Sequence, residues 1–396
     1  MDEQRRWGKV DLLPSSKNRQ RLTRELINVP LSGLLVPSRV CVIIPTVDNS
    51  TELAVVLDGL SNQTFQEIDV AVVGPDGDPG RRVAEERGFR YIDDRGSGNR
   101  ADACNVAIEE TDSELIFFTD DDVIVPRDWV EKLERWFERP EVSGVGGPNF
   151  APVEESDIWQ KSIDVAFCNK FLTAGTNYGR RSEGALEEVE QLPGVNSAYR
   201  RVVLEEVGGF DQGAIGAEDV MMDHRIRSLG HRLWSDGTAT MWHRRRGIGR
   251  VRKQIRNYGL VRTLAGKRYP SLWGWSHGLV SAFPILVCFS LMTFIWGCLN
   301  GGLAWPSFWD ISTEAVPLGV ERSSVHQFPT LAILFNIIAW TGAILGPSPS
   351  KSPMTVIISS MISFMLLWDY GIGVNKARIS ILTGSPNSQI DDRDRG

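Results

Sequence analysis

The distribution of charged residues divides the chain into a mixed N-terminal part and a strongly apolar C-terminal part. Three C-terminal stretches contain no charged side chain: 278–309, 327–350 and 352–368. Each can supply the roughly 17–25 apolar residues that a helix needs to cross a bilayer. Buried core helices are the alternative, but three such stretches in succession disfavour it. We therefore predict a transmembrane region over 278–374, with helices near 279–301, 328–347 and 353–374.

The N-terminal part alternates strand and helix patterns over residues 39–245. Apolar runs typical of buried parallel strands are RVCVIIP, IDVAVVG, RYID and ELIFFTD. The segments with helical spacing between them are TELAVVLDGLSNQ, RRVAEERG and NRADACNVAIEETD. This alternation predicts an α/β fold with a doubly wound, mostly parallel sheet and helices on both faces. Ligands bind such sheets beyond the carboxyl ends of the strands, where Pro45–Asp48, Gly74–Asp78 and Asp120–Asp122 fall.

The charges beside the apolar stretches predict the topology. Residues 246–277 form a basic juxtamembrane segment without an acidic side chain, and positive segments stay on the cytoplasmic side of a membrane. We expect a multi-pass protein of the cell membrane whose α/β part is cytoplasmic and whose 302–327 loop is external. The polar tail, 375–396, would then be external, although Lys376 and Arg378 near its start favour the opposite side.

The overall composition excludes some classes of partner. The net charge is −7 and no basic excess spans the chain, which argues against binding to nucleic acid. The five cysteines are scattered and form no CxxC pair, so we expect free thiols in a reducing compartment. The N-terminal extension, 1–38, lacks the apolar core of a signal peptide, so we expect the chain to begin in the cytoplasm.

Three adjacent carboxylates, Asp120, Asp121 and Asp122, follow the apolar run LIFF. Their mutual repulsion needs either solvent or a cation. A surface acidic turn is the simpler interpretation, but this turn ends a strand that the pattern places inside the sheet. Mg²⁺ and Mn²⁺ prefer carboxylate oxygens and often share them with a substrate diphosphate. The sequence therefore suggests a divalent metal site here.

Six segments in order resemble a known family: VCVIIPT, GNRADACNVAI, FFTDDDVIVPRDWV, LPGVNSAYRRVVLEEVGGFDQ, GAEDVMMDHRIRSLGHRLW and DGTATMWHRRR. Together, over roughly 39–260, they resemble the family 2 glycosyltransferases of the GT-A fold. The resemblance implies a Rossmann-like catalytic domain over 39–245 and a divalent metal, Mn²⁺ or Mg²⁺. It also implies single-displacement, inverting transfer of a sugar from a nucleotide-sugar donor.

The resemblance assigns donor and metal roles to individual residues. The donor-binding residues it implies are Pro45, Thr46, Asp76, Arg100, Asp120 and Asp121, and the implied metal ligands are Asp120, Asp122 and His243. A register shift of one residue would exchange Asp121 with a neighbouring aspartate. The turn VGPDGDPG departs from the DDGS-like turn of the family, so Asp78 is the alternative to Asp76. A solvated helix face is the alternative role for Arg100, and a structural role is the alternative for His243.

On the acceptor side the resemblance makes Asp219 the general base, which takes a proton from the acceptor hydroxyl as the new bond forms. Glu218 would orient the site or the acceptor. Gly194 and Asn196 would form a tight turn near the sugar. The alternative for the two acids is an ordinary helix N-terminus, where negative charge favours the helix dipole.

These inferences predict a membrane-bound enzyme that transfers a sugar to a polyprenyl- or dolichyl-phosphate-linked acceptor, or to another membrane-associated glycan, in glycan or glycoprotein biosynthesis. The basic stretch 244–268 would contact lipid headgroups or bind a phosphate of the donor or of a lipid acceptor. A processive polysaccharide synthase is one alternative, although RKQIRNYG lacks the tryptophan of the QxxRW motif that such enzymes carry. A sugar-nucleotide pyrophosphorylase and a catalytically inactive membrane scaffold are the others.

Overall fold

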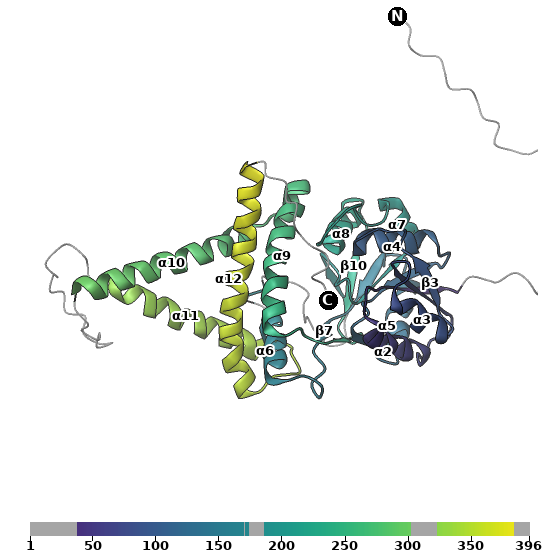
Figure 1. Cartoon of the computed structure of the whole chain (residues 1–396), viewed down its shortest axis with the longest axis horizontal. Helices are drawn as coiled ribbons and strands as arrows, with labels where there is room; N and C mark the ends of the chain where they lie inside the picture. The colour runs from purple at the N-terminus through teal and green to yellow at the C-terminus, as the bar shows by residue number, and fades with distance from the viewer. Residues whose placement is uncertain (1–37, 170, 174–185, 302–322, 384–396) are drawn as a thin grey trace, which may run out of the picture. The chain divides into compact units, whose positions relative to one another are not determined.

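The computed structural model describes residues 38–169, 171–173, 186–301 and 323–383 (Figure 1). The predicted N-terminal extension up to residue 37, most of the predicted external loop and the last part of the predicted tail lie outside these residues. The description below concerns the unit that begins at Ser38.

An eight-stranded sheet forms the centre of the α/β part, with the order β3-β2-β1-β4-β9-β6-β10-β8. Its strands are β1 (Val40–Pro45), β2 (Ile68–Gly74), β3 (Arg90–Asp93), β4 (Leu115–Phe118), β6 (Gly144–Gly146), β8 (Leu186–Val189), β9 (Ser197–Arg200) and β10 (Leu233–Asp236). Strands β3, β2, β1 and β4 are parallel, and so are β6 and β10. Strand β9 runs antiparallel to β4 and β6, and β8 runs antiparallel to β10. The mostly parallel α/β sheet that the sequence predicts is confirmed.

Helices cover both faces of this sheet. In the α/β part they are α2 (Ser50–Ser61), α3 (Pro79–Glu86), α4 (Arg100–Glu109), α5 (Trp129–Glu134), α6 (Ile158–Phe167), α7 (Arg201–Val207) and α8 (Glu218–Ser228), with a 3₁₀ turn η2 (Arg135–Glu138). Side chains of β1 alternate between the two faces, as the strand period of two requires. Val42 and Ile44 pack with α2, whereas Cys41 and Ile43 pack with α4.

The strand order reverses between β1 and β4, because β1 pairs with β2 on one side and with β4 on the other. The carboxyl ends of these two strands therefore open onto the crevice where ligands bind in doubly wound sheets. Strand β5 (Val123–Ile124), which follows β4 directly in the chain, belongs to a second sheet with β11 (Met241–His243) and β7 (Asn149–Phe150). Both features put the Asp120–Asp122 turn at the edge of the crevice.

The C-terminal part consists of α9 (Ile248–Arg268), the 3₁₀ turn η3 (Pro270–Leu272), α10 (Trp275–Gly301), α11 (Ser323–Leu345) and α12 (Pro353–Thr383). The last three correspond to the three predicted apolar helices. Among the described residues, α12 alone is long and apolar enough to cross a membrane by length and composition, with a mean hydropathy of 1.5. The others contribute shorter apolar stretches, Ser276–Met292 and Leu331–Leu345. A set of three spans is therefore not established by the structure.

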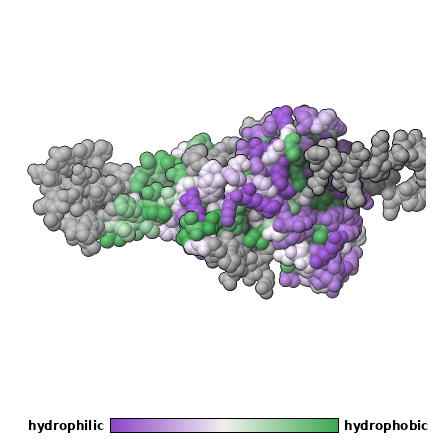
Figure 2. Space-filling view, turned by 90° about the horizontal axis from the view of Figure 1, so that it is seen from above, coloured by the Kyte–Doolittle hydropathy of each residue, from purple (hydrophilic) through white to green (hydrophobic). Residues whose placement is uncertain are grey.

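Helix α12 continues to Thr383, past residue 374, where the predicted transmembrane region ends. Apolar residues such as Ile379 continue the helical pattern, and no proline or glycine interrupts it there. Apolar side chains on the outside of α10, α11 and α12 form the hydrophobic surface in Figure 2, whereas hydrophilic residues cover the α/β part.

Helix α12 packs along α9 (Figure 1), and two half-exposed arginines of α9 pair with one buried carboxylate of α12. Asp369 on α12 is fully buried and binds Arg252 Nε at 2.6 Å and Arg256 Nη2 at 2.5 Å, both on α9. Glycine permits the close approach of the two backbones, because a Cβ on Gly373 would lie 1.9 Å from the Arg256 carbonyl oxygen. Asp369, the one acidic residue of α12, is thereby paired within the protein.

A second buried cluster joins the turn between α11 and α12 to the α/β part. Asp164 on α6 is fully buried and accepts hydrogen bonds from Arg245 Nη2 at 2.7 Å and from Ser348 Oγ at 2.6 Å. Nearby, Asn169 donates to the Ala339 carbonyl at 2.8 Å. Because these groups are buried and satisfied, the C-terminal helices form part of the folded core around α6.

Candidate functional site

The first half of the site is a cluster of two carboxylates and a histidine at the carboxyl end of β4. Asp120, Asp122 and His243 each offer a ligand atom, and these atoms lie within 4.8 Å of one another. Local pairing produces this geometry, because β11 runs antiparallel to β5 with His243 opposite Val123. The histidine is thereby brought next to Asp122 from more than a hundred residues away in the sequence.

Buried atoms of this cluster lack hydrogen-bond partners in the described chain. They are Asp122 Oδ1 and both ring nitrogens of His243. Asp122 Oδ1 and His243 Nε2 approach to 3.1 Å. Burial opposes ionisation of Asp122, but His243 and Arg246 outweigh it and lower the pKa of its carboxyl. Unpaired oxygen and nitrogen atoms that converge on one point fit a divalent cation, for which these are suitable ligands.

The middle aspartate, Asp121, has a different partner. Thr46 Oγ1 at the end of β1 donates to Asp121 Oδ2 at 2.5 Å. Burial raises the pKa of this carboxyl to about 7, against the effect of that hydrogen bond. The structure therefore separates the three aspartates into two that face the histidine and one that faces β1. Pro45 and Thr46 lie at this same edge, where the sequence predicts donor binding.

The second half of the site is the start of α8, where Glu218 and Asp219 lie. Asp219 Oδ2 accepts from Gly194 N at 3.2 Å, and Oδ1 accepts from Val220 N at 2.8 Å. Burial and the neighbouring Glu218 raise the pKa of the Asp219 carboxyl to about 6, although Arg100 opposes them. A carboxylate with this pKa can accept a proton near neutral pH.

Arg100 joins the two halves. Its Nη2 donates to Asp120 Oδ1 at 3.1 Å and to the Gly194 carbonyl at 3.0 Å, and its Nη1 lies 3.6 Å from Glu218 Oε1. The guanidinium therefore fixes the distance between the histidine–carboxylate cluster and the start of α8. A contact of Arg100 with a nucleotide stays a prediction.

Three other predicted residues lie at different depths. Asp76 is exposed and pairs with Arg81 at 3.1 Å. Asp78 is buried, where it caps α3 through Gly80 N at 2.7 Å and accepts from Asp48 N at 2.8 Å. Asn196 is fully buried, and its side chain bonds Trp129 Nε1 at 2.8 Å and the Ala239 carbonyl at 2.7 Å. It lies beneath the site and supports the Gly194 turn, so its acceptor role stays a prediction.

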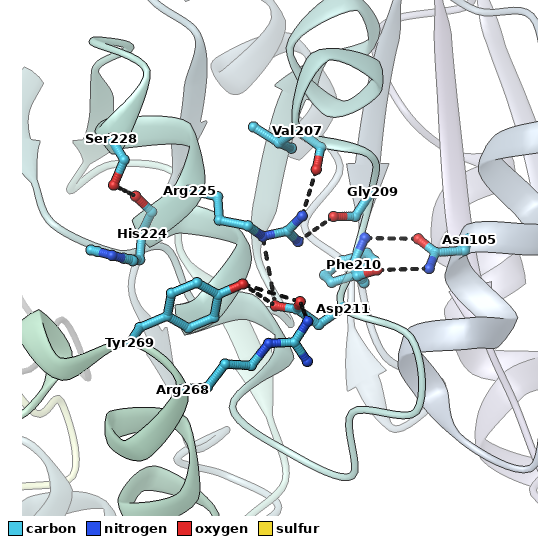
Figure 3. Close-up of polar contacts among 10 residues, drawn as sticks. All are labelled: Asn105, Val207, Gly209, Phe210, Asp211, His224, Arg225, Ser228, Arg268 and Tyr269. Atoms are coloured by element: carbon cyan, nitrogen blue, oxygen red, sulfur yellow. Dashed lines mark hydrogen bonds and ion pairs between the residues drawn. The ribbon is translucent and has the colours of Figure 1, made fainter.

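The loop that leads to Asp219, residues 211–217, is called the base loop below, and Asp211 fixes its start (Figure 3). This buried carboxylate lies 2.7 Å from Arg268 Nη2 and 3.6 Å from Arg225 Nε, and it accepts from Tyr269 Oη at 3.2 Å. Asn105 holds the preceding residue, Phe210, through both its backbone N–H and its carbonyl. Arg268 and Tyr269 come from the end of α9, so this helix supports the loop.

The end of the same loop also rests on α9. Gly216 and Ala217 directly precede Glu218, and both have a positive φ, of 153° and 56°. A Cβ on Gly216 would lie 3.1 Å from the Val261 side chain of α9. Ala217 packs with Leu260, Val261 and Ala377. The role of Asp211 in this support was not predicted, because no local pattern in the GGFDQ segment reveals a partner that is 57 residues away.

Comparison with known proteins identifies the domain that carries Asp120 and Asp122. Residues 41–208 match the sequence model described as "Glycosyl transferase family 2". The chain contains a glycosyltransferase family 2 domain. The matched segment of this domain includes Asp120 and Asp122 and ends before the Asp219 loop and His243.

Two curated proteins are similar in sequence to part of this chain. An N-acetylglucosaminyltransferase of Azorhizobium caulinodans is 30% identical over 160 residues, which are 37% of this chain and 40% of that protein. The O-antigen chain rhamnosyltransferase RfbN of Salmonella typhimurium is 24% identical over 52% of this chain and 66% of that protein. The chain thus spans less than two thirds of the length of either relative.

A solved structure extends the likeness of fold beyond the family 2 domain. The mannosyltransferase PcManGT from Pyrobaculum calidifontis, in complex with GDP-Man and Mn²⁺, aligns with a TM-score of 0.53 at 16% identity. The alignment covers 93% of this chain and 95% of that one. At this identity the likeness shows the fold, and it confirms the GT-A-like α/β architecture that the sequence predicts.

The Asp211 contacts lead to a prediction about stability. We expect Asp211→Asn to lower the free energy of unfolding by roughly 1–3 kcal/mol, because the contacts with Arg225 and Arg268 lose their charge. The exposure of Arg268 keeps this cost below that of a fully buried pair. Thermal unfolding of the whole chain measures it. Glu86→Gln, which removes an exposed ion pair with Arg82, is the control. Equal stability of the two variants would contradict the assignment.

Proposed function

We propose that the protein is an inverting glycosyltransferase that moves a sugar from a nucleotide-sugar donor to a membrane-associated acceptor. A polyprenyl- or dolichyl-phosphate-linked acceptor fits best. The observation that carries this proposal is the link through Arg100 between the Asp120–Asp122–His243 cluster and the start of α8, where Asp219 lies. This arrangement supports the proposal of a metal-binding group and a base on either side of Arg100.

Asp120, Asp122 and His243 would hold a divalent cation, Mn²⁺ or Mg²⁺. The unpaired buried atoms of this set support the assignment, and the solved PcManGT complex holds Mn²⁺ together with GDP-Man. When bound, such a cation supplies charge stabilisation for a departing diphosphate. The side chain of Asp121 and the end of β1 lie beside the cluster, where they can bind the nucleoside of the donor.

Asp219 would act as the general base. Its Oδ1 and Oδ2 are oriented by Val220 N and Gly194 N. It takes the proton of the acceptor hydroxyl while that oxygen forms a bond to the anomeric carbon, and the bond to the nucleoside diphosphate breaks. A single displacement of this kind inverts the anomeric centre and needs no second carboxylate as a nucleophile. Glu218 pairs with Arg100 and keeps the base loop close to the metal ligands.

The C-terminal helices would keep the site at the membrane. We propose that α10 and α11 insert into the bilayer, that α12 lies at the membrane surface along α9, and that the α/β part is cytoplasmic, because the basic α9 precedes the apolar helices. The long apolar α12 and the exposed apolar side chains of α10 and α11 support this proposal (Figure 2). Anchoring raises the local concentration of a lipid-linked acceptor.

A donor screen tests the proposed reaction. The full chain, in nanodiscs, is incubated with Mn²⁺ and a panel of nucleotide sugars, and with a membrane lipid extract as the acceptor source. We expect release of nucleoside diphosphate with one donor and a labelled product in the lipid phase. Release of pyrophosphate would indicate a pyrophosphorylase, and products of many lengths would indicate a processive synthase. No product with any donor would favour the scaffold alternative.

The pKa of Asp219 predicts how transfer depends on pH. Only the ionised carboxylate accepts a proton, so lowering the pH through about 6 should remove the active form. We expect kcat/KM to fall by about tenfold per pH unit below that value and to level off above it. The measurement uses saturating metal at each pH. The residual activity of Asp219→Asn should lack this slope, and a slope that persists in that variant would assign it to another group.

A further inference from the structure

Arg262 on α9 is a largely buried guanidinium for which the described chain provides no anionic partner. It makes no ion pair with any described carboxylate, and its Nη1 atom is buried without a hydrogen-bond partner. Its one polar contact among the described residues is Nε to His277 Nε2, at 3.4 Å. The other α9 arginines with buried contacts are different, since Arg252 and Arg256 both bind Asp369. A buried charge that lacks a partner is costly, so its retention points to an anion that arrives with a ligand.

The neighbours of Arg262 offer hydrogen-bond donors in excess of acceptors. Nδ1 of His277 accepts from Gly274 N at 3.2 Å. A neutral imidazole has one acceptor nitrogen, so Nε2 then carries a proton. The His277 Nε2–H group and the Arg262 guanidinium are therefore two hydrogen-bond donors that face each other. The adjacent positive charge of Arg262 favours this neutral form of the ring. The ring of Tyr370, on α12, lies 6.5 Å from the imidazole. The group that would satisfy this cluster is a hydrogen-bond acceptor with negative charge.

The position of the cluster indicates which substrate would bring the anion. Val261, the residue before Arg262, packs against Gly216 of the base loop. Burial lowers the pKa of Arg262, and the nearby Tyr370, Asp219 and Glu190 oppose this effect, although neither carboxylate is paired with it. His277 and Tyr370 belong to α10 and α12, the helices of the apolar region. Arg262 therefore lies between the base and these helices, whereas Arg100 and the metal ligands are on the donor side of Asp219.

We propose that Arg262, with His277 and Tyr370, forms a binding site for the phosphate of a lipid-linked acceptor. The inference rests on the proposed function and adds to it the residues that recognise the acceptor. The guanidinium binds phosphate oxygens, and His277 Nε2–H and Tyr370 Oη can donate to the same group. The lipid tail then lies against the apolar helices, and the phosphate fixes the acceptor with its hydroxyl near Asp219.

Binding of a defined probe tests the site without any transfer reaction. The full chain, in nanodiscs of neutral phosphatidylcholine, is titrated with farnesyl phosphate, farnesol and inorganic phosphate. We expect farnesyl phosphate to raise the Tm and the other two to do so far less. Arg262→Met should weaken its binding by about 10–100-fold, and Arg262→Lys should restore part of it. Arg250→Met, which removes an exposed charge from the same helix, should bind as the wild type does.

Stability separates this role from a structural one. Without ligand, Arg262→Met should unfold at the same temperature as the wild type or higher, because an unpaired buried charge has been replaced by an apolar side chain of similar length. A lower Tm together with unchanged farnesyl phosphate affinity would show that Arg262 serves the fold, and would overturn the proposal. Equal response to inorganic phosphate and farnesyl phosphate would overturn the assignment to a lipid.

The donor and the proposed reaction are tested separately. Binding of GDP and UDP with Mn²⁺ should be the same in Arg262→Met and in the wild type, and loss of that binding would assign Arg262 to the donor instead. If the protein transfers no sugar but Arg262→Met still loses farnesyl phosphate, the proposed function fails and the phosphate site stands. If transfer occurs and the variant uses lipid phosphates as the wild type does, the site alone fails.

Discussion

Asp219→Asn is expected to lower kcat by about 10²–10⁴-fold, the usual contribution of a general base. Asparagine keeps the size of the side chain, and its single amide oxygen can still accept from Val220 N, the shorter of the two bonds that the carboxylate makes, while the longer bond from Gly194 N is lost. What it lacks is the ability to take a proton near pH 7. The loop should therefore keep its conformation while the chemical step is lost.

Donor affinity separates this explanation from a general loss of structure. Binding of the nucleotide with Mn²⁺, measured by titration calorimetry, should match the wild type, because Asp219 contacts neither Asp122 nor His243. Asp112→Asn makes the same chemical change at an exposed position and should leave kcat unaltered. Transfer by Asp219→Asn at the wild-type rate would show that the base is elsewhere.

Asp122→Asn is expected to weaken Mn²⁺-dependent nucleotide binding by at least about 100-fold. Loss of a residue that only hydrogen-bonds a metal ligand already lowers metal affinity by about 10–100-fold, and Asp122 is a proposed ligand itself. The buried Oδ1 atom of Asp122 faces His243 Nε2 at 3.1 Å without a hydrogen bond. An amide in its place is a weaker ligand for a hard cation and cannot balance its charge. Transfer should be lost together with metal binding.

The shift in Tm that Mn²⁺ causes can be compared between the wild type, Asp122→Asn and a control variant. Mn²⁺ should raise the Tm of the wild type in the presence of a nucleoside diphosphate and leave that of Asp122→Asn unchanged. Without the nucleotide, which Asp121 is proposed to bind, Asp121→Asn should retain most of the wild-type response to Mn²⁺, because Asp121 faces Thr46 and not the histidine. Full wild-type activity in excess EDTA would contradict a metal at this cluster.

The first half of the sheet could be predicted because its strands are continuous apolar runs. The predicted strand and helix segments from residue 39 to the acidic turn correspond to β1 through β4. The later strands are short, and some are polar on both faces, as in LEEV of β8. Their pairing depends on β9, which inserts antiparallel between β4 and β6. No periodicity within a segment specifies such a long-range arrangement.

Part of the candidate site could likewise be predicted from the sequence, and part depends on contacts between distant residues. The acidic turn and the GAED segment are local patterns, and in the structure Arg100 contacts a carboxylate of each. Which aspartates face His243 depends on the register of β5 against β11, which the sequence leaves open. The burial of Asn196 depends on Trp129, and the support of the base loop depends on α9. These contacts join residues far apart in the chain, so only the folded structure shows them.

The cluster of Asp164, Arg245 and Ser348 limits how the protein can be shortened for study. A soluble fragment that ends before α10 would keep Asp164 and Arg245 but lose the hydroxyl that covers the second carboxylate oxygen. The same cut removes Ala377 from beneath the loop of Asp219. The kinetic constants of such a fragment would then describe a catalytic domain that has lost native contacts. Kinetic work on this protein should therefore retain the apolar C-terminus in detergent or lipid.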